Sequence, residues 1–178
     1  MSFKNTLLSL AVSGLALASI GLLSFTPSSH VPTEENASSY RPAHGATPWQ
    51  NCFGPNASCS YYGCSEIEVT ASYSSDVMVT IKRGGKIVKH AYIHAGRTYK
   101  FELPDGTYQP FFYYGKNWDP DKMMNSASCS SMRGGYTEDE SFDKDNPVTL
   151  KGEILTYELI AQINGNFDTK PSNAKEAF

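Results

Sequence analysis

The stretch VMVTIKRGGKIVKHAYIH, residues 77–94, decides the fold. Apolar and polar residues alternate before the glycine pair, a pattern typical of β-strands with one buried face. Gly84 and Gly85 take positive φ without steric cost, as a two-residue type I′ turn requires. The stretch therefore predicts a hairpin of strands 77–83 and 86–94. Opposed residues in such a hairpin share a face, and the expected pairs are Ile81 with Val88, Val79 with His90, and Val77 with Tyr92.

Working outward, the same alternation predicts four more strands, at 65–71, 98–103, 107–114 and 155–163, of which the last should be the longest. Strand 86–94 is apolar on both sides, which favours a central position, and Pro110 favours an edge or a bulge for strand 107–114. Residues 115–134 lack periodicity and predict a long loop with one short helical turn, and the acidic stretch 137–146 predicts another loop. The fold class predicted is all-β, a small antiparallel β-sandwich or open barrel with long loops and two disulfides.

The N-terminus carries an export signal. Residues 7–25 (LLSLAVSGLALASIGLLSF) contain no charge and follow Lys4. This segment is either a cleaved signal peptide, with Ala16-Leu17-Ala18 as one cleavage motif, or an uncleaved anchor of nearly bilayer-spanning length. Either way, the positive-inside rule places the rest of the chain outside the cytoplasm, so the location is periplasmic, extracellular or membrane-anchored facing outward.

The chain divides into four parts on composition. Residues 1–25 are the signal peptide or anchor, 26–48 a Pro/Ser-rich flexible linker, 49–167 the β-sandwich domain and 168–178 a frayed polar tail. His30 and His44 fall in the linker, where solvated side chains are expected.

Four cysteines in an exported chain indicate two disulfides. Three pairings are possible, and we favour Cys52 with Cys59 and Cys64 with Cys129, because the second bridge would join the two halves of the domain. Zinc is the alternative, but it needs closely spaced ligand pairs, which only the Cys59-x4-Cys64 spacing approaches.

Residues 77–109 end in a strand and turn formed by Leu103, Pro104, Gly106 and Tyr108. This L-P-x-G-x-Y turn, after two strands joined by glycines, resembles the small β-sandwich modules of the PEGA and transthyretin-like kind. The resemblance covers about a fifth of the chain, and it implies a sandwich topology and a non-enzymatic role. From Gln50 onward the chain also resembles small exported bacterial proteins of unassigned function.

Several classes of chemistry lack the residues they need. The slightly negative net charge and the absence of a basic cluster exclude nucleic acid as a partner. His90 and His94 would lie roughly 13 Å apart along a strand, too far to share a metal ion. The acidic stretch with Asp139, Glu140, Asp143 and Asp145 lacks calcium-loop spacing, and calcium binding stays an open alternative to a solvated loop. No metal and no cofactor is expected.

The most unusual local feature is the aromatic run of residues 107–118. Alternation places Tyr108, Phe112 and Tyr114 on one face of the strand and Phe111 and Tyr113 on the other. One set should enter the core, and the other should be partly exposed, where aromatic rings stack on sugars or on protein side chains. The predicted binding residues are Phe111, Tyr113, Tyr114, Trp118 and Asp119; packing beneath the following loop is the alternative.

We therefore predict an exported, non-catalytic module that binds a protein or a glycan in the cell envelope or outside the cell. The membrane is a partner only through an uncleaved N-terminal segment. A secreted hydrolase is the first alternative, with acids drawn from Asp119, Asp121, Glu138 and Glu140. A structural envelope protein is the second. No nucleophile elbow, H-E-x-x-H motif or phosphate-binding loop is present in the sequence.

Overall fold

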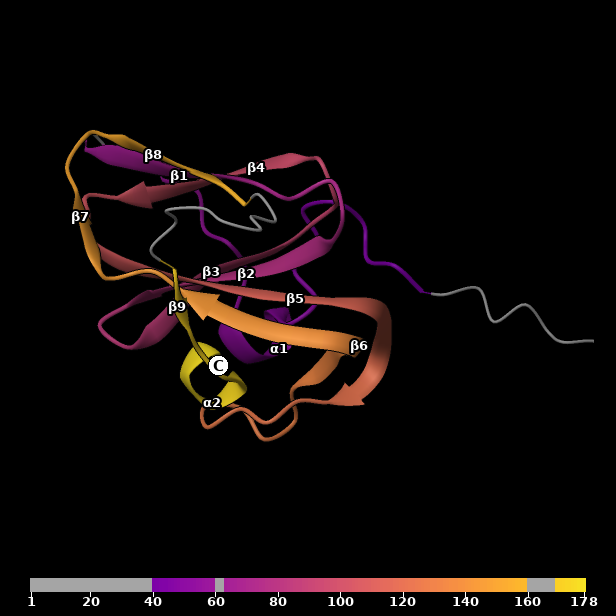
Figure 1. The fold of residues 1–178 in the computed structure, drawn as a ribbon. Helices are drawn as coiled ribbons and strands as arrows, with labels where there is room; N and C mark the ends of the chain where they lie inside the picture. Colours follow the sequence, from indigo (N-terminus) through magenta and orange to yellow (C-terminus); the bar gives the residue numbers. More distant parts are fainter. Residues whose placement is uncertain (1–39, 60–62, 160–168) are drawn as a thin grey trace, which may run out of the picture. The chain divides into compact units, whose positions relative to one another are not determined.

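A computed structural model describes residues 40–59, 63–159 and 169–178. Within them, two β-sheets pack as a sandwich, which confirms the predicted fold class (Figure 1). The smaller sheet has the order β4-β1-β8, and the larger has the order β3-β2-β5-β6-β9, with β7 paired to β5. The strands are β1 (Cys64–Thr70), β2 (Asp76–Arg83), β3 (Lys86–Ile93), β4 (Thr98–Pro104), β5 (Gly106–Met123), β6 (Arg133–Lys144), β7 (Val148–Leu150), β8 (Ile154–Glu158) and β9 (Lys170–Pro171). All described pairs are antiparallel except β1 with β8.

The core between the sheets is built from the alternating residues of the first strands, as their pattern predicted. Ile67 and Val69 of β1 face Val77 and Val79 of β2, and all four are completely buried. Tyr157 and Leu159 close this core beneath β8. The predicted strand 155–163 ends earlier, at Glu158, and residues 160–163 lie outside the described part. It is not the longest strand, because β5 has 18 residues.

The hairpin of β2 and β3 forms as predicted, but its register is wrong by one residue. Lys82 pairs with Ile87, whereas Ile81 pairs with Lys89, so Val88 is an extra residue that forms a β-bulge. A one-residue slip moves every following side chain to the opposite face. His90 therefore lies opposite Thr80, on the outer face of the large sheet, instead of opposite Val79.

Two stretches predicted as loops are strands. β5 continues through residues 115–123, and β6 covers most of the acidic stretch 137–146. Both lie in one ladder, from Phe111 opposite Lys144 to Met123 opposite Arg133, with two irregularities. The pattern did not reveal β6 because its residues 137–141 are all exposed, so no apolar alternation marks them. Pro110 does not place β5 at an edge, since β2 and β6 flank it.

The outer face of the large sheet is also apolar and has its own covering layer (Figure 1). The short helices α1 (Gln50–Phe53) and α2 (Ala174–Ala177) lie over this face. Trp49 and Phe178 meet there edge to face, with ring centroids 4.6 Å apart, and both are buried. The described part of the predicted tail, residues 169–178, is therefore not frayed.

β3 lies at an edge of its sheet, not in the centre, and residues 40–48 cover that edge. Gly45 donates its N–H to the Tyr92 carbonyl (2.7 Å), and the Tyr92 N–H donates to Ala46 (2.8 Å). Asn56 bonds the backbone N–H and carbonyl of His90 with its side chain. The last nine residues of the predicted flexible linker thus form an ordered segment, which we call the strap (residues 40–48). Covering an edge strand removes a template for unwanted pairing.

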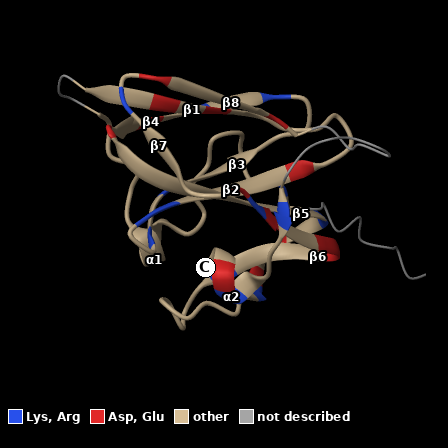
Figure 2. Ribbon diagram, turned by 60° about the vertical axis from the view of Figure 1, so that its left-hand side comes forward, with Lys and Arg blue, Asp and Glu red and all other residues tan. Residues whose placement is uncertain are grey.

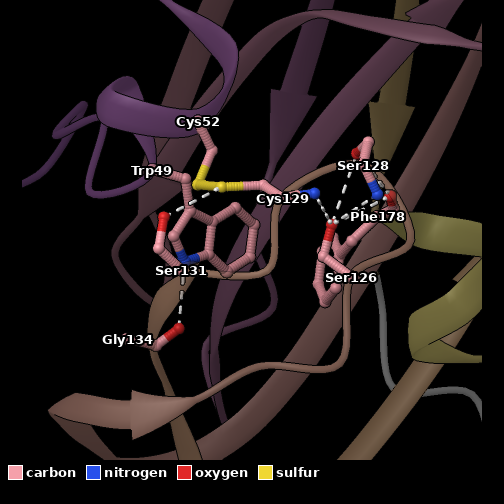
Figure 3. The surroundings of a disulfide bond; sticks show 8 residues. All are labelled: Trp49, Cys52, Ser126, Ser128, Cys129, Ser131, Gly134 and Phe178. Carbon is pink, nitrogen blue, oxygen red and sulfur yellow. Dashed lines mark hydrogen bonds between the residues drawn. A yellow bond between two sulfur atoms is a disulfide. The ribbon is translucent and has the colours of Figure 1, made fainter.

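Both disulfides form, but the predicted pairing is wrong. Cys52 bonds Cys129, 77 residues away, and Cys59 bonds Cys64, five residues away. The bridge from Cys52 fastens α1 to the loop between β5 and β6, next to the buried Trp49, whose indole N–H donates to Gly134 (Figure 3). With all four cysteines bonded, no thiolate is left for zinc. Two disulfides indicate an oxidising, exported environment.

Within residues 40–59, 63–159 and 169–178 no helix has the length and apolarity needed to cross a membrane. The hydrophobic run 7–25 lies outside those residues.

The two bridges should differ in their effect on stability, because the entropy removed from the unfolded chain grows with loop length. Replacing Cys52 and Cys129 together by alanine should lower the free energy of unfolding by about 4 kcal/mol, and replacing Cys59 and Cys64 by about 2 kcal/mol. Urea unfolding at neutral pH measures both losses. Peptide mapping without reduction checks the pairing, and a Cys64–Cys129 peptide would contradict it.

Candidate functional site

The predicted aromatic binding surface is buried. Phe111, Tyr113 and Trp118 are 4%, 1% and 5% exposed. With Trp49 and Phe178 they form the cluster on the outer face of the large sheet, which we call the outer core, in contrast to the inner core between the sheets. The face assignment by alternation is confirmed, since Tyr108, Phe112 and Tyr114 pack on the inner core instead. Both faces are covered because the strap, α1 and α2 supply a layer that the strand pattern does not reveal. Trp118→Ala or Tyr113→Ala would cost about 3–5 kcal/mol of core packing and would not be a clean test of binding.

A cleft of about 440 Å³ opens where β5 passes the strap and the turn before β2. Trp118 and Tyr136 line it, and of the five predicted binding residues Trp118 alone is among its described walls. The full lining is Tyr40, Arg41, Ser74, Ser75, Asp76, Tyr92, Ala95, Gly115, Lys116, Asn117, Trp118 and Tyr136. Concave sites with aromatic walls and a few convergent polar groups are the usual form of ligand sites.

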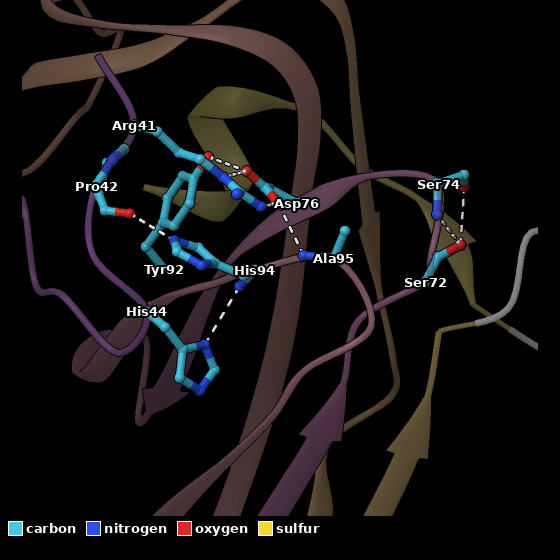
Figure 4. Close-up of polar contacts among 9 residues, drawn as sticks. All are labelled: Arg41, Pro42, His44, Ser72, Ser74, Asp76, Tyr92, His94 and Ala95. Atoms are coloured by element: carbon cyan, nitrogen blue, oxygen red, sulfur yellow. Dashed lines mark hydrogen bonds and ion pairs between the residues drawn. The ribbon is translucent and has the colours of Figure 1, made fainter. Parts of the chain in front are cut away.

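The Asp76 carboxylate organises the wall of this cleft (Figure 4). It accepts two hydrogen bonds from Arg41, at 2.6 and 2.7 Å, one from the Tyr92 hydroxyl at 2.7 Å and one from the Ala95 N–H at 2.8 Å. Burial alone would raise the Asp76 pKa, but the bonds from Arg41, Tyr92 and Ala95 outweigh it and hold the pKa below its ordinary value. Burial, followed by the bond to Asp76, raises the pKa of Tyr92. The carboxylate is thus ionised and fully bonded, and it joins the strap to β2 and β3.

We call Asp76 with its donors Arg41, Tyr92 and Ala95 the Asp76 clamp. Two histidines hold the strap beside it (Figure 4). His44 accepts the His94 backbone N–H at Nδ1 (3.3 Å) and donates from Nε2 to Thr98 (3.1 Å). His94 donates from Nε2 to the Pro42 carbonyl (2.7 Å). Burial lowers the pKa of His44, consistent with a neutral ring in this role. His44 is therefore a bonded residue, in contrast to the solvated one predicted.

The lower rim of the cleft is a β-bulge in the ladder of β5 and β6. The pairing shifts between Tyr114 and Lys116, and Asn117 has a φ of +52°. The Asn117 carbonyl accepts the Thr137 hydroxyl (2.9 Å), and Asp139 on the facing strand also has positive φ, at +50°. Bulges re-aim side chains and are frequent beside functional sites. Here the bulge turns Lys116 and Asn117 into consecutive walls of the cleft.

Acidic residues are concentrated on β6 (Figure 2). They do not converge on one point: Asp139 pairs with Lys116 (2.7 Å), and Glu140 pairs with Lys122 (2.6 Å). Asp76 is the one carboxylate among the described residues that line the cleft. Of the acids considered for a hydrolase, none of Asp119, Asp121, Glu138 and Glu140 is among those residues.

His90 and His94, the other residues considered for a metal, lie in different surroundings. His90 is 1% exposed and stacks on Trp49, with a centroid separation of 6.4 Å, while His94 bonds the strap. Burial lowers the pKa of His90 to about 4, although a hydrogen bond to the Thr47 backbone acts to raise it. In the described part of the chain, no three His, Cys, Asp or Glu side chains come together as a metal site.

Sequence reasoning missed Arg41, Asp76, Tyr92 and Tyr136. Asp76 carried one weak signal, since it is a lone acid between the polar turn Ser74-Ser75 and an apolar strand. Its partner Arg41 is 35 residues away and lies in a segment without periodicity, so no local pattern joins them.

Comparison with protein-family models, with curated proteins and with solved structures found no match. The resemblance to PEGA and transthyretin-like modules therefore stays a prediction.

Replacing Asp76 with asparagine should destabilise the fold. The amide keeps the size and one acceptor oxygen, but its NH2 group faces two of the four donated hydrogen bonds, which should lower the free energy of unfolding at pH 7 by about 2–3 kcal/mol. Because the folded-state pKa is depressed, the wild-type contribution is present above the unfolded pKa near 3.9 and is lost as pH falls through the folded value. Urea unfolding against pH measures this. Asp121→Asn, at an exposed carboxylate, is the control and should change stability by less than about 0.5 kcal/mol.

Acid should also weaken the fold through His90. Its folded pKa of about 4 lies below the unfolded value near 6.5, so the unfolded chain takes up a proton first as pH falls between these values. The loss approaches roughly 3 kcal/mol at pH 4, at about 1.4 kcal/mol per pKa unit. His90→Phe should remove this part of the pH dependence, measured by urea unfolding at pH 7 and 4.5. An imidazole NMR titration of His90 with a midpoint near 6.5 would contradict it.

Proposed function

We propose that this chain is an exported, non-catalytic β-sandwich module that binds a protein or a glycan through the cleft between the strap and β5. The observation that carries the proposal is the cleft itself: about 440 Å³, walled by aromatic and polar side chains and fixed by the Asp76 clamp. Such preorganised walls lower the entropic cost of binding. The domain works in the periplasm, outside the cell, or tethered to the membrane through residues 7–25.

The proposal moves the binding surface from the aromatic strand to its bulged continuation. Four consecutive residues of this continuation line the cleft: Gly115, Lys116, Asn117 and the predicted binding residue Trp118. The aromatic rings of β5 support this surface from below, since Trp118 packs edge to face on both Tyr92 and Tyr136. Their role in binding is thus to hold the cleft floor rigid.

A binding assay with paired variants tests this function. The oxidised protein is screened against immobilised glycans and against envelope-protein fractions, and every bound partner is retested with Asn117→Gly. Glycine keeps the positive φ and removes the amide, so it should reduce capture at least fivefold, about the effect of one hydrogen bond, without unfolding the domain. Lys86→Gln, at the exposed far hairpin, is the control and should leave capture unchanged. Capture that is equal for the cleft variant and the wild type would refute this site.

A further inference from the structure

We infer that the ligand of this cleft is an uncharged glycan. The inference rests on the proposed function and narrows it from a protein or a glycan to neutral, hydroxyl-rich oligosaccharide. Five features of the described residues support it: paired charges, acidic surroundings, neutral polar groups, an exposed aromatic rim and an edge already occupied by the strap.

The charges of the cleft are neutralised by partners within the protein. Arg41 forms a bidentate pair with Asp76, whose two oxygens each accept two hydrogen bonds (Figure 4). Lys116 pairs with Asp139, which is not itself among the described lining residues. An anion would therefore compete with Asp76 for Arg41, whereas the exposed pair of Lys116 with Asp139 opposes it only weakly. The N–H groups of Arg41 and Lys116 can still donate hydrogen bonds to a neutral hydroxyl, and this leaves both ion pairs intact.

The electrostatic potential around the cleft is negative and disfavours anionic ligands. Glu138 lies opposite the cleft residue Lys116 in the ladder, Asp139 and Glu140 follow it along β6, and the chain carries a formal net charge of −3. Acidic polysaccharide would meet this potential over several sugar units, and repulsion of that kind slows and weakens association.

Neutral polar groups on the walls match vicinal hydroxyls. Ser75 and Asn117 offer groups that both donate and accept, as sugar hydroxyls do, whereas the Ser74 hydroxyl is already bonded to that of Ser72 (2.8 Å). The Asn117 amide has no bonding partner among the described residues, although its backbone is held by Thr137. The Tyr136 hydroxyl is buried at the cleft and interacts with the Tyr92 hydroxyl, which itself donates to Asp76.

The rim carries an exposed aromatic ring. Tyr40 is 56% exposed where the strap enters the cleft. Tyr73, at 92%, lies next to Ser74 in the turn before β2 but outside the lining. Tyrosine offers an apolar face to the C–H side of a sugar ring and a hydroxyl to its edge. A peptide would instead gain most from pairing with a free strand, and here the strap already bonds the β3 edge at Tyr92.

Isothermal titration of the oxidised protein tests the class of ligand. The panel consists of neutral hexasaccharides (cello-, malto-, chito-, xylo- and manno-oligosaccharide), oligogalacturonate as the acidic counterpart, and poly-Glu and poly-Lys peptides. We expect at least one neutral member to bind, with a Kd that changes less than about twofold between 0.05 and 0.5 M NaCl, because screening acts on net charge.

Matched variants locate the site. Asn117→Gly and Tyr40→Ala should each weaken binding of the neutral sugar about fivefold or more, whereas Asn125→Gly and Tyr73→Ala, at exposed positions outside the lining, should not. Asp139→Asn leaves Lys116 without its partner and should bring measurable, salt-sensitive binding of oligogalacturonate.

The outcomes separate the inference from the function on which it rests. Binding of oligogalacturonate or a peptide alone, weakened by Asn117→Gly, would overturn the neutral glycan and keep the binding module. Binding of a neutral sugar that Asn117→Gly and Tyr40→Ala leave unchanged would overturn the site. If no member of the panel binds, the inference is overturned. If the wild-type protein also captures no partner from immobilised glycans or envelope fractions, the proposed function is overturned as well.

Discussion

The architecture depends on one constraint: the central strands of the large sheet are apolar on both faces. Val77 and Val79 of β2 point into the sandwich, while Met78 and Tyr92 on the neighbouring positions point outward, and all are fully buried. The smaller sheet covers one face only. The second face, which includes Phe111 and Tyr113, would expose several large aromatic side chains to water, at about 25 cal/mol per Å² of apolar surface. A second covering layer is therefore obligatory.

That layer comes from both ends of the described chain, and its attachment creates the cleft. Trp49 and Phe178 meet over Tyr113, and the Cys52–Cys129 bridge ties the N-terminal part of the layer to the loop after β5. To reach this position the strap runs along β3, where Arg41 meets Asp76. The Asp76 clamp therefore fastens the strap, which leads into the covering layer. The cleft is the space that remains between the strap and the bulged part of β5.

The sequence allowed prediction of what depends on local periodicity. The strands from β1 to β4, the two-residue turn at Gly84-Gly85 and the faces of the aromatic residues in β5 all follow from period-two alternation, and the structure confirms them. Bulges, disulfide pairing and the covering layer depend on contacts between distant residues. Val88 is extra in its strand without any residue type that marks a bulge, and residues 137–141 of β6 are exposed and held by the ladder with β5 rather than by burial. The candidate site was predictable only at Trp118.

The same departures from regularity that escaped prediction place the site. The ladder shifts between Tyr114 and Lys116, just beyond the last pair of β5 with β2, and Asn117 has positive φ. Lys116 and Asn117 follow this shift, and both are exposed and line the cleft. Asn117 adopts this conformation more readily than most residues, and Thr137 fixes its carbonyl. A left-handed backbone costs about 1 kcal/mol or more and adds nothing to the core, and its position beside Asp76 is one reason to propose the cleft as the binding site.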